Sequence, residues 1–161
     1  MKKKDLIFFG VCGAVAALFI FTADIKTPGE YYALHPAEIS EDGAYVKLTI
    51  DCSSVAKKDK ALPDDGTMLT GSYALASGES VYDITARVLH YENIPFDVSG
   101  GKAVYIDGIG GLYELDYGAE SGWIYTVNGT APDINCGEYK PLSGDEIEFI
   151  YVDSYYKGAG R

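Results

Sequence analysis

The sequence predicts an α+β domain with a β-grasp-like mixed sheet and one main helix, preceded by an N-terminal transmembrane helix. Residues 44–52 and 146–153 alternate apolar and polar side chains, which is typical of half-buried strands. Residues 80–93 instead carry apolar side chains at helical spacing. Because two predicted strands precede this helix and several follow it, we expect the helix to pack on one face of a mixed sheet.

Residues 1–23 form the expected membrane anchor. Three lysines precede an uncharged run of 18 residues from Leu6 to Ala23, about the length that spans a bilayer as a helix. The positive-inside rule keeps the lysines in the cytoplasm, so we expect a single-pass cell-membrane protein with an extracytoplasmic C-terminal domain. Cleavage as a signal peptide is the alternative and would give a secreted domain. Ala23 fits a cleavage site, but Phe21 stands where a small residue is preferred.

Two further regions follow the anchor. Residues 24–42 contain Pro28, Gly29 and Pro36 among scattered acidic residues, which indicates an extended linker. Residues 43–161 then form the predicted globular domain, and the total length of 161 residues suits one domain plus accessories.

The first half of this domain predicts a hairpin and a helix. The strand at 44–52 and a second strand at 68–76 are separated by a turn that ends in Pro-Asp-Asp-Gly at 63–66. Ser80 is placed to cap the helix, with Asp83 three residues on as its capping-box partner.

The second half predicts mainly strands. Residues 103–106, 112–117 and 122–127 form three short strands, and residues 146–153 form the last one. The dipeptide at 128–129, Asn-Gly, favours a tight hairpin turn after the third of them.

Composition excludes several functions. The chain has 13 basic and 24 acidic residues and a net charge of −11, so it repels phosphate backbones and is not expected to bind nucleic acid. It has no Gly-rich phosphate loop, no dinucleotide fingerprint and no convincing nucleophile–histidine set. The cysteines lack zinc-ligand spacing. We therefore expect no enzymatic activity, no metal site and no resident cofactor.

Aromatic residues are concentrated in the second half of the chain. They are Tyr113, Tyr117, Trp123, Tyr125, Tyr139, Tyr151, Tyr155 and Tyr156. Such rings offer stiff contact area with a polar group, which suits flat organic ligands, sugars or protein partners. Packing within a sheet is the alternative, because strands favour these residues in any case.

Three cysteines are present. Cys12 lies inside the apolar run, whereas Cys52 and Cys136 lie in the domain. In an extracytoplasmic domain such a pair forms either a disulfide or two free buried thiols, and the residues alone leave both open.

Four motifs together resemble the bacterial transcobalamin-like C-terminal domain family. The most recognisable is GWIYTVNG at 122–129, and GESVYDI at 78–84 is similar to the family's turn into its helix. YIDGI at 105–109, followed by LYE, resembles the middle strands, and YKPLSGDEI at 139–147 resembles the closing stretch. Each motif alone is weak, but they occur in consistent order.

The resemblance implies a β-grasp domain of the soluble-ligand-binding kind. Its animal relatives, the C-terminal domains of transcobalamin and intrinsic factor, help to enclose cobalamin. By this likeness the edge near Trp123 and Tyr125 faces a ligand, and Tyr113, Asn128 and Gly129 are further candidate contacts. The animal carriers also have a large helical-barrel domain, for which this chain has no room.

The resemblance also bears on the cysteines. Many family members carry four, and here Tyr117 and about position 153 occupy two of those places. Loss of one bridge as a unit leaves the other, so the resemblance implies a Cys52–Cys136 disulfide.

The leading functional hypothesis is a non-enzymatic, membrane-anchored binding module for a small soluble ligand such as cobalamin or another corrinoid. A transporter or surface protein would be its partner. The alternative is a structural or protein-interaction module of the cell surface without a small-molecule ligand.

Overall fold

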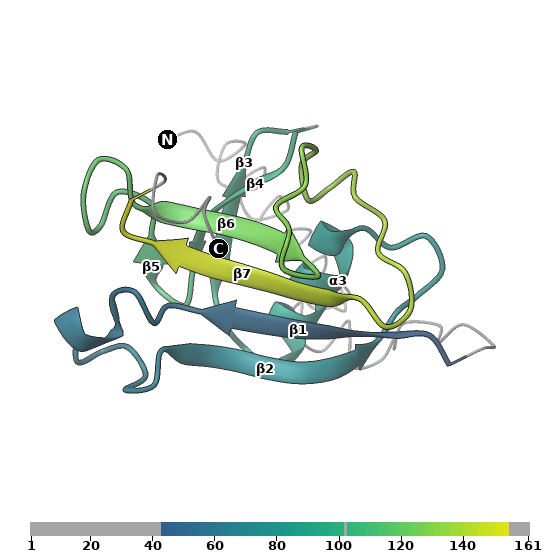
Figure 1. The fold of residues 1–161 in the computed structure, drawn as a ribbon, viewed down its shortest axis with the longest axis horizontal. Coiled ribbons are helices and arrows are strands. Elements are labelled where there is room, and N and C mark those ends of the chain that lie inside the picture. Colours follow the sequence, from purple (N-terminus) through teal and green to yellow (C-terminus); the bar gives the residue numbers. More distant parts are fainter. Residues whose placement is uncertain (1–42, 102, 155–161) are drawn as a thin grey trace, which may run out of the picture.

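The computed structural model describes residues 43–101 and 103–154. They form an α+β arrangement of two sheets and one main helix (Figure 1). The predicted α+β class and single main helix are therefore confirmed for this part of the chain. The predicted anchor at 1–23 and linker at 24–42 lie outside the described residues. Among the described residues, no helix has the length and apolar character needed to cross a membrane.

The larger sheet has four strands in the order β2-β1-β7-β6. They are β1 (Tyr45–Asp51), β2 (Thr67–Ala74), β6 (Gly122–Val127) and β7 (Glu146–Val152). β1 pairs antiparallel with β2 and parallel with β7, and β7 pairs antiparallel with β6. The sheet is therefore mixed, as expected, and the first and last described strands lie side by side at its centre. A short 3₁₀ helix, η1 (Ala56–Lys58), lies between β1 and β2.

Alternation along the strands decides which side chains enter the core. Successive side chains of a strand point to opposite faces, so one apolar set from each strand can be buried together. The buried set from the two central strands is Val46, Leu48, Ile50, Ile147, Phe149 and Tyr151. The alternation along both strands was predicted from the sequence, and the structure shows which set faces inward.

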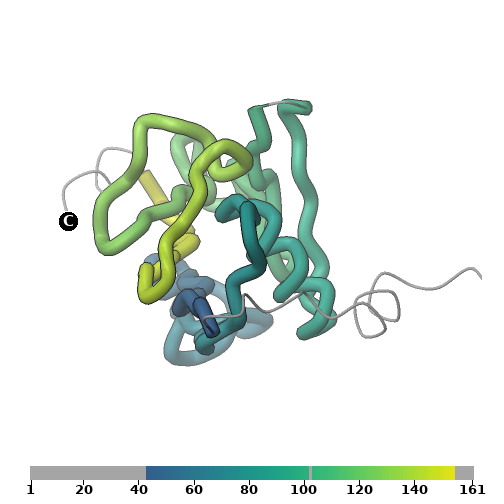
Figure 2. The backbone as a smooth tube through the Cα atoms, turned by 90° about the vertical axis from the view of Figure 1, so that its right-hand side faces the viewer, coloured from purple at the N-terminus to yellow at the C-terminus, as the bar shows by residue number. Residues whose placement is uncertain are grey.

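Helix α3 (Val81–Tyr91) packs on the inner side of the larger sheet (Figures 1 and 2). Its predicted capping box is confirmed: the Asp83 amide donates to Ser80 Oγ at 3.1 Å, and the Ser80 amide donates to the Asp83 carboxylate at 2.8 Å. These two bonds satisfy amides that have no partner within the helix. Ile84 and Val88 on the apolar face of the helix are buried in the core.

A second sheet of three strands, in the order β3-β4-β5, lies on the same side as the helix. Its strands are β3 (Phe96–Ser99), β4 (Tyr105–Ile109) and β5 (Leu112–Tyr113). The expectation of a single sheet is therefore wrong, and strand β3 was not expected. The strand predicted at 112–117 is cut to two residues, because Leu115 takes a positive φ of 68° and turns the chain.

The implied disulfide is also wrong in this structure, because Cys52 and Cys136 are both free, buried thiols. Cys52 follows β1, and its amide donates to the Gly66 carbonyl. Cys136 instead lies where its thiol donates to the Val104 carbonyl and its own carbonyl accepts from the first turn of α3. The two cysteines therefore bond to different segments of the chain, although both belong to the same hydrophobic core.

Candidate functional site

Strand β6 is an outer strand of the four-stranded sheet, and one of its edges faces away from β7. The Asn128 amide donates to the Glu146 carbonyl at 2.8 Å. This bond shows which residues of β6 direct their backbone groups toward β7 and which direct them away. Every second residue in such a ladder directs its backbone groups to the partner strand. Trp123 and Tyr125 alternate with the residues that bond to β7. Their N–H and C=O groups therefore point away from β7, along the free edge.

Both ends of this free edge are closed by backbone hydrogen bonds. At one end the Leu115 amide donates to the Ser121 carbonyl at 3.0 Å, and at the other the Val127 amide donates to the Thr130 carbonyl at 2.9 Å. Between them, the described residues supply no hydrogen-bond partner for the backbone groups of Trp123 and Tyr125. We call this stretch the open edge of β6.

A hollow of about 270 Å³ lies beside the open edge. Residues of β4, β6 and β7 and of the segments beside them form its walls, and most of the lining side chains are apolar. The lining residues are Val104, Tyr105, Ile106, Trp123, Ile124, Tyr125, Ala131, Pro132, Asn135, Cys136 and Phe149. Unpaired backbone donors and acceptors therefore lie next to an apolar surface, a combination typical of ligand sites.

The Trp123 side chain belongs to the core as well as to one wall of the hollow. The residue is only 2% exposed, and its ring packs edge-to-face against Tyr151, with ring centroids 5.3 Å apart. Its Nε1 donates to the Leu112 carbonyl at 2.9 Å. The indole therefore cannot serve as an exposed stacking surface, and little of Trp123 as a whole is accessible.

Tyr125 is half-buried beside the same hollow. Its ring stacks on Phe149 at a centroid distance of 5.9 Å, and its hydroxyl donates to the Ile134 carbonyl. Burial raises the pKa of the Tyr125 hydroxyl to about 12, and the neighbouring Cys136 adds to the rise. The hydroxyl therefore stays protonated at neutral pH and holds the segment that lines the hollow.

The other three predicted contact residues lie elsewhere. Tyr113 on β5 is 42% exposed, and its hydroxyl donates to the Asp97 carboxylate at 2.7 Å, a bond that raises the pKa of Tyr113. Asn128 and Gly129 both take positive φ values, 52° and 74°, and form the predicted tight turn. That turn closes one end of the open edge and does not line the hollow beside it.

Cys136 is the residue of this hollow with the most distinctive chemistry. Burial raises the pKa of its thiol to about 11, so the group is neutral at physiological pH and is a poor nucleophile. Burial likewise raises the pKa of Cys52. Within residues 43–101 and 103–154, no group of three His, Cys, Asp or Glu side chains is placed to hold a metal ion.

For several residues that line the hollow, no sequence pattern indicated that they would lie near β6. Val104, Ala131, Pro132 and Asn135 come from loops and strand ends, and their proximity to β6 depends on how the two sheets pack. The strand expected at 122–127 does have the bounds of β6.

Comparisons with known proteins give a family and a fold. The model of a family described as a domain of unknown function (DUF4430) matches residues 71–153. None of the curated proteins matches the chain.

Two solved structures are similar in fold. Haptocorrin in complex with Cbi has a TM-score of 0.51 and 14% sequence identity, over 70% of this chain and 26% of haptocorrin. A protein from Ruminococcus gnavus, described as a "putative metal binding protein", has a TM-score of 0.47 and 15% identity, over 70% of this chain and 99% of that one. At these identities the likeness concerns the fold alone.

Proposed function

The chain belongs to the DUF4430 family, and we propose that its domain is a non-enzymatic module that binds a small soluble ligand at the open edge of β6. The observation that carries this proposal is the coincidence of two features. Backbone groups of Trp123 and Tyr125 have no partner among the described residues, and an apolar hollow of about 270 Å³ lies directly beside them. A bound ligand would supply the hydrogen bonds that a strand edge otherwise finds in water.

The backbone donors and acceptors of the open edge support a ligand that carries carboxamides. The outward groups along the edge are amide N–H and C=O groups, and a primary carboxamide carries both a donor and an acceptor. Corrinoids such as cobalamin bear carboxamides around an otherwise largely apolar ring. We therefore propose a corrinoid whose amides pair with the edge while its ring contacts the hollow.

The size of the hollow limits how the ligand is held. Sites that enclose a small molecule have volumes of roughly 300–1,000 Å³, and about 270 Å³ suffices only for one side of a corrinoid. The match also covers only 26% of haptocorrin, whose structure is that of a complex with Cbi, a cobalamin analogue. A transporter or surface protein would then cover the rest of the ligand.

The proposed location follows from the first 23 residues. If they remain as a helix in the membrane, the module collects its ligand outside the cell close to a transporter. Cleavage after this segment would instead release a secreted binding domain.

Titration of the full chain in detergent with cyanocobalamin and with cobinamide tests the proposal. Binding should slow amide hydrogen exchange at Trp123 and Tyr125. Ala131→Trp places a large ring at the exposed rim of the hollow and should abolish binding. Ala61→Trp is the matched control, because this exposed alanine does not line the hollow.

Two outcomes would contradict the corrinoid assignment. One is the absence of binding at high micromolar concentrations of both corrinoids, and the other is binding that Ala131→Trp leaves unchanged. In either case the alternative, a protein-interaction module, becomes the better explanation, since an extended peptide can also pair with an open strand edge. We favour the small ligand because the edge is open over only three residues, which is short for strand pairing.

A further inference from the structure

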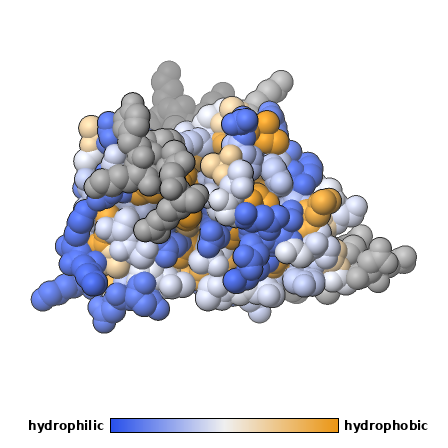
Figure 3. All heavy atoms as spheres, in the orientation of Figure 1, coloured by the Kyte–Doolittle hydropathy of each residue, from blue (hydrophilic) through white to orange (hydrophobic). Residues whose placement is uncertain are grey.

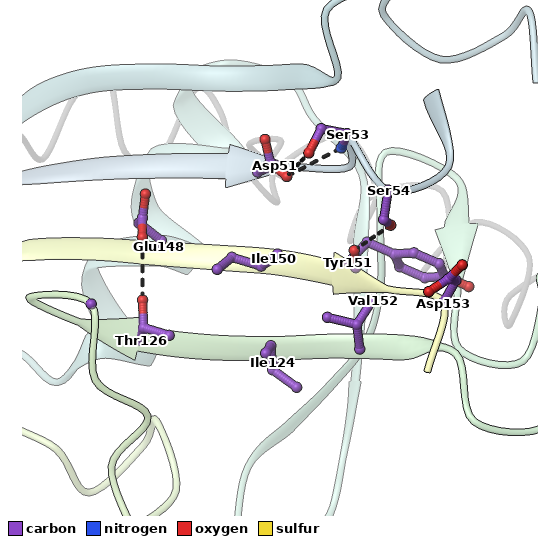
Figure 4. Close-up of a pocket in the computed structure, with 11 residues that line it drawn as sticks. Asp51, Ser53, Ser54, Ile124, Thr126, Glu148, Ile150, Tyr151, Val152 and Asp153 are labelled. Atoms are coloured by element: carbon purple, nitrogen blue, oxygen red, sulfur yellow. Dashed lines mark hydrogen bonds between the residues drawn. The ribbon is translucent and has the colours of Figure 1, made fainter. Parts of the chain in front are cut away.

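The outer face of the four-stranded sheet contains a second and larger hollow, of about 510 Å³ (Figure 4). Figure 3 shows hydrophilic and hydrophobic residues interspersed on the visible part of this face. Residues of β1, β6 and β7 and of the turns beside them line the hollow. They are Asp51, Ser53, Ser54, Ile124, Thr126, Gly129, Glu148, Ile150, Tyr151, Val152 and Asp153.

The floor of this hollow is apolar. Ile124 and Ile150 are directly paired across β6 and β7, and Val152 follows two residues further along the same face. Figure 4 shows the three side chains next to one another between the polar residues. The volume lies within the range of small-molecule sites, roughly 300–1,000 Å³.

Two carboxylates beside the floor have no cationic partner within residues 43–101 and 103–154. The Glu148 carboxylate accepts a hydrogen bond of 3.4 Å from the Thr126 hydroxyl, and the Asp51 carboxylate accepts one of 2.7 Å from the Ser53 hydroxyl. Neither forms an ion pair with a lysine or arginine among the residues that the structure describes, whereas Asp153 at the rim pairs with Lys58 at 3.4 Å.

The register brings these two carboxylates to one side of the floor. Glu148 is paired with Thr49 of β1, so Asp51 lies two residues further along the adjacent strand, on the same face. Diagonal neighbours of this kind lie about 7–8 Å apart in a sheet. A single elongated molecule can therefore contact both carboxylates and the apolar floor at once.

We propose that this hollow binds an organic cation that combines ammonium groups with a hydrocarbon body. Ammonium groups would form charge-assisted hydrogen bonds with Glu148 and Asp51, which are stronger than neutral ones. The hydrocarbon body would cover Ile150 and its neighbours and remove apolar surface from water. A metal ion fits less well, because no cluster of three ligand side chains is found in the described part of the chain.

This site is separate from the open edge of β6. It lies on the outer face of the sheet, whereas the other hollow adjoins the inner-facing rings of Trp123 and Tyr125, and only Ile124 borders both. The inference therefore does not depend on the proposed corrinoid function.

Binding of hexamethylenediamine to the full chain in detergent tests the inference, with hexanediol as its uncharged analogue. We expect the diamine to bind and the diol to bind at least about tenfold more weakly, because two charge-assisted hydrogen bonds are lost. Glu148→Gln and, separately, Asp51→Asn should each weaken diamine binding by about tenfold. Ala131→Trp should leave it unchanged.

Glu146→Gln is the matched control, because Glu146 lies on the same strand and face but pairs with Lys47 and does not line the hollow. Equal binding of the diol and the diamine would overturn the inference. So would an equal loss of diamine binding in Glu146→Gln and Glu148→Gln, since the effect would then come from the general charge of the surface. Unchanged diamine binding in both Glu148→Gln and Asp51→Asn would overturn it as well.

Discussion

The indole nitrogen of Trp123 donates a hydrogen bond of 2.9 Å to the Leu112 carbonyl, which links β6 of the larger sheet to β5 of the smaller one. Both residues are buried, so this bond is shielded from water. A buried carbonyl that loses its donor carries a desolvation penalty of about 1–3 kcal/mol. The bond therefore makes Trp123 a connection between the two sheets as well as a core residue.

Replacement of Trp123 should destabilise the domain in two steps. Trp123→Phe keeps most of the ring but removes the donor, so we expect a loss of about 1–3 kcal/mol in unfolding free energy. Trp123→Ala also leaves a cavity and should cost about 3–5 kcal/mol. Urea denaturation measures both, and Tyr91→Phe, at an exposed position, serves as the control. Equal stability of Trp123→Phe and the parent would show that the bond contributes nothing.

The capping box predicts a measurable effect at the start of α3. Ser80→Ala removes the acceptor of the Asp83 amide and should lower the unfolding free energy by about 0.5–2 kcal/mol. Ser77→Ala, at an exposed position outside the helix, makes the same chemical change and should have little effect. Thermal unfolding followed by circular dichroism compares the two variants. A smaller loss for Ser80→Ala than for Ser77→Ala would contradict this role.

Two glycines with nearly the same backbone conformation should respond differently to alanine. Gly66 and Gly78 have φ values of 79° and 78°, but an added Cβ would lie 2.3 Å from Ser53 Cα at Gly66 and meet nothing within 4 Å at Gly78. Gly78→Ala should therefore cost about 1–2 kcal/mol for the left-handed conformation alone. Gly66→Ala should cost about 1–3 kcal/mol more, because the turn is overpacked. Denaturant midpoints of the two variants give the comparison, and similar midpoints would refute it.

The free thiols predict slow reaction with thiol reagents. In a Cys12→Ser background, Cys52 and Cys136 should react slowly with dithionitrobenzoate at pH 8, and both should react fully in denaturant. Because the pKa of Cys136 is about 11, its alkylation rate should still rise between pH 9 and 11. Reducing agent should leave the melting temperature unchanged. A chain that lacks two hydrogens by mass and melts lower after reduction would show that the disulfide forms.

Alkaline pH should weaken the region around the open edge. The pKa of Tyr125 is raised from 10.0 to about 12 and that of Cys136 from 9.0 to about 11, so both groups hold their protons more tightly when folded. Their contribution to stability is complete below about pH 9 and is lost as the pH rises through 11 and 12. Tyr125→Phe should therefore lose less stability between pH 10 and 12 than the parent. Unfolding free energies measured across this range test it, and parallel pH curves for the two proteins would contradict it.

Sequence reasoning succeeded where a local pattern was strong. The strand at 122–127 was predicted with the bounds of β6, and Ser80 with Asp83 marked the start of α3. It failed at β3 (Phe96–Ser99), because a short strand with mostly exposed side chains lacks the alternation that identifies a strand. It also failed at the cysteines, since a spacing along the chain does not indicate how far apart two residues lie when folded.

For the aromatic residues, too, the sequence indicated the strand but not the surroundings of its side chains. The motif at 122–129 lies on β6 and the turn after it, as expected, but no assignment of inner and outer faces was made for this strand. However, sequence could not tell that a second sheet would pack against this strand, bury Trp123 and bond its indole nitrogen. The candidate site combines backbone groups of β6 with apolar side chains from several segments, and no single motif encodes that combination.

By itself, the sequence determined the class of the fold, the alternation of side chains along β1 and β7, the cap of α3 and the tight turn at Asn128 and Gly129. Each of these depends on neighbours within a few residues, where side-chain spacing and backbone preference act directly. Only the tertiary structure decided which strand edge and which outer-face carboxylates find no partner in the described part of the chain, and that Cys52 and Cys136 are free thiols. Those features arise from contacts between segments far apart in the chain, and such contacts depend on how whole elements pack.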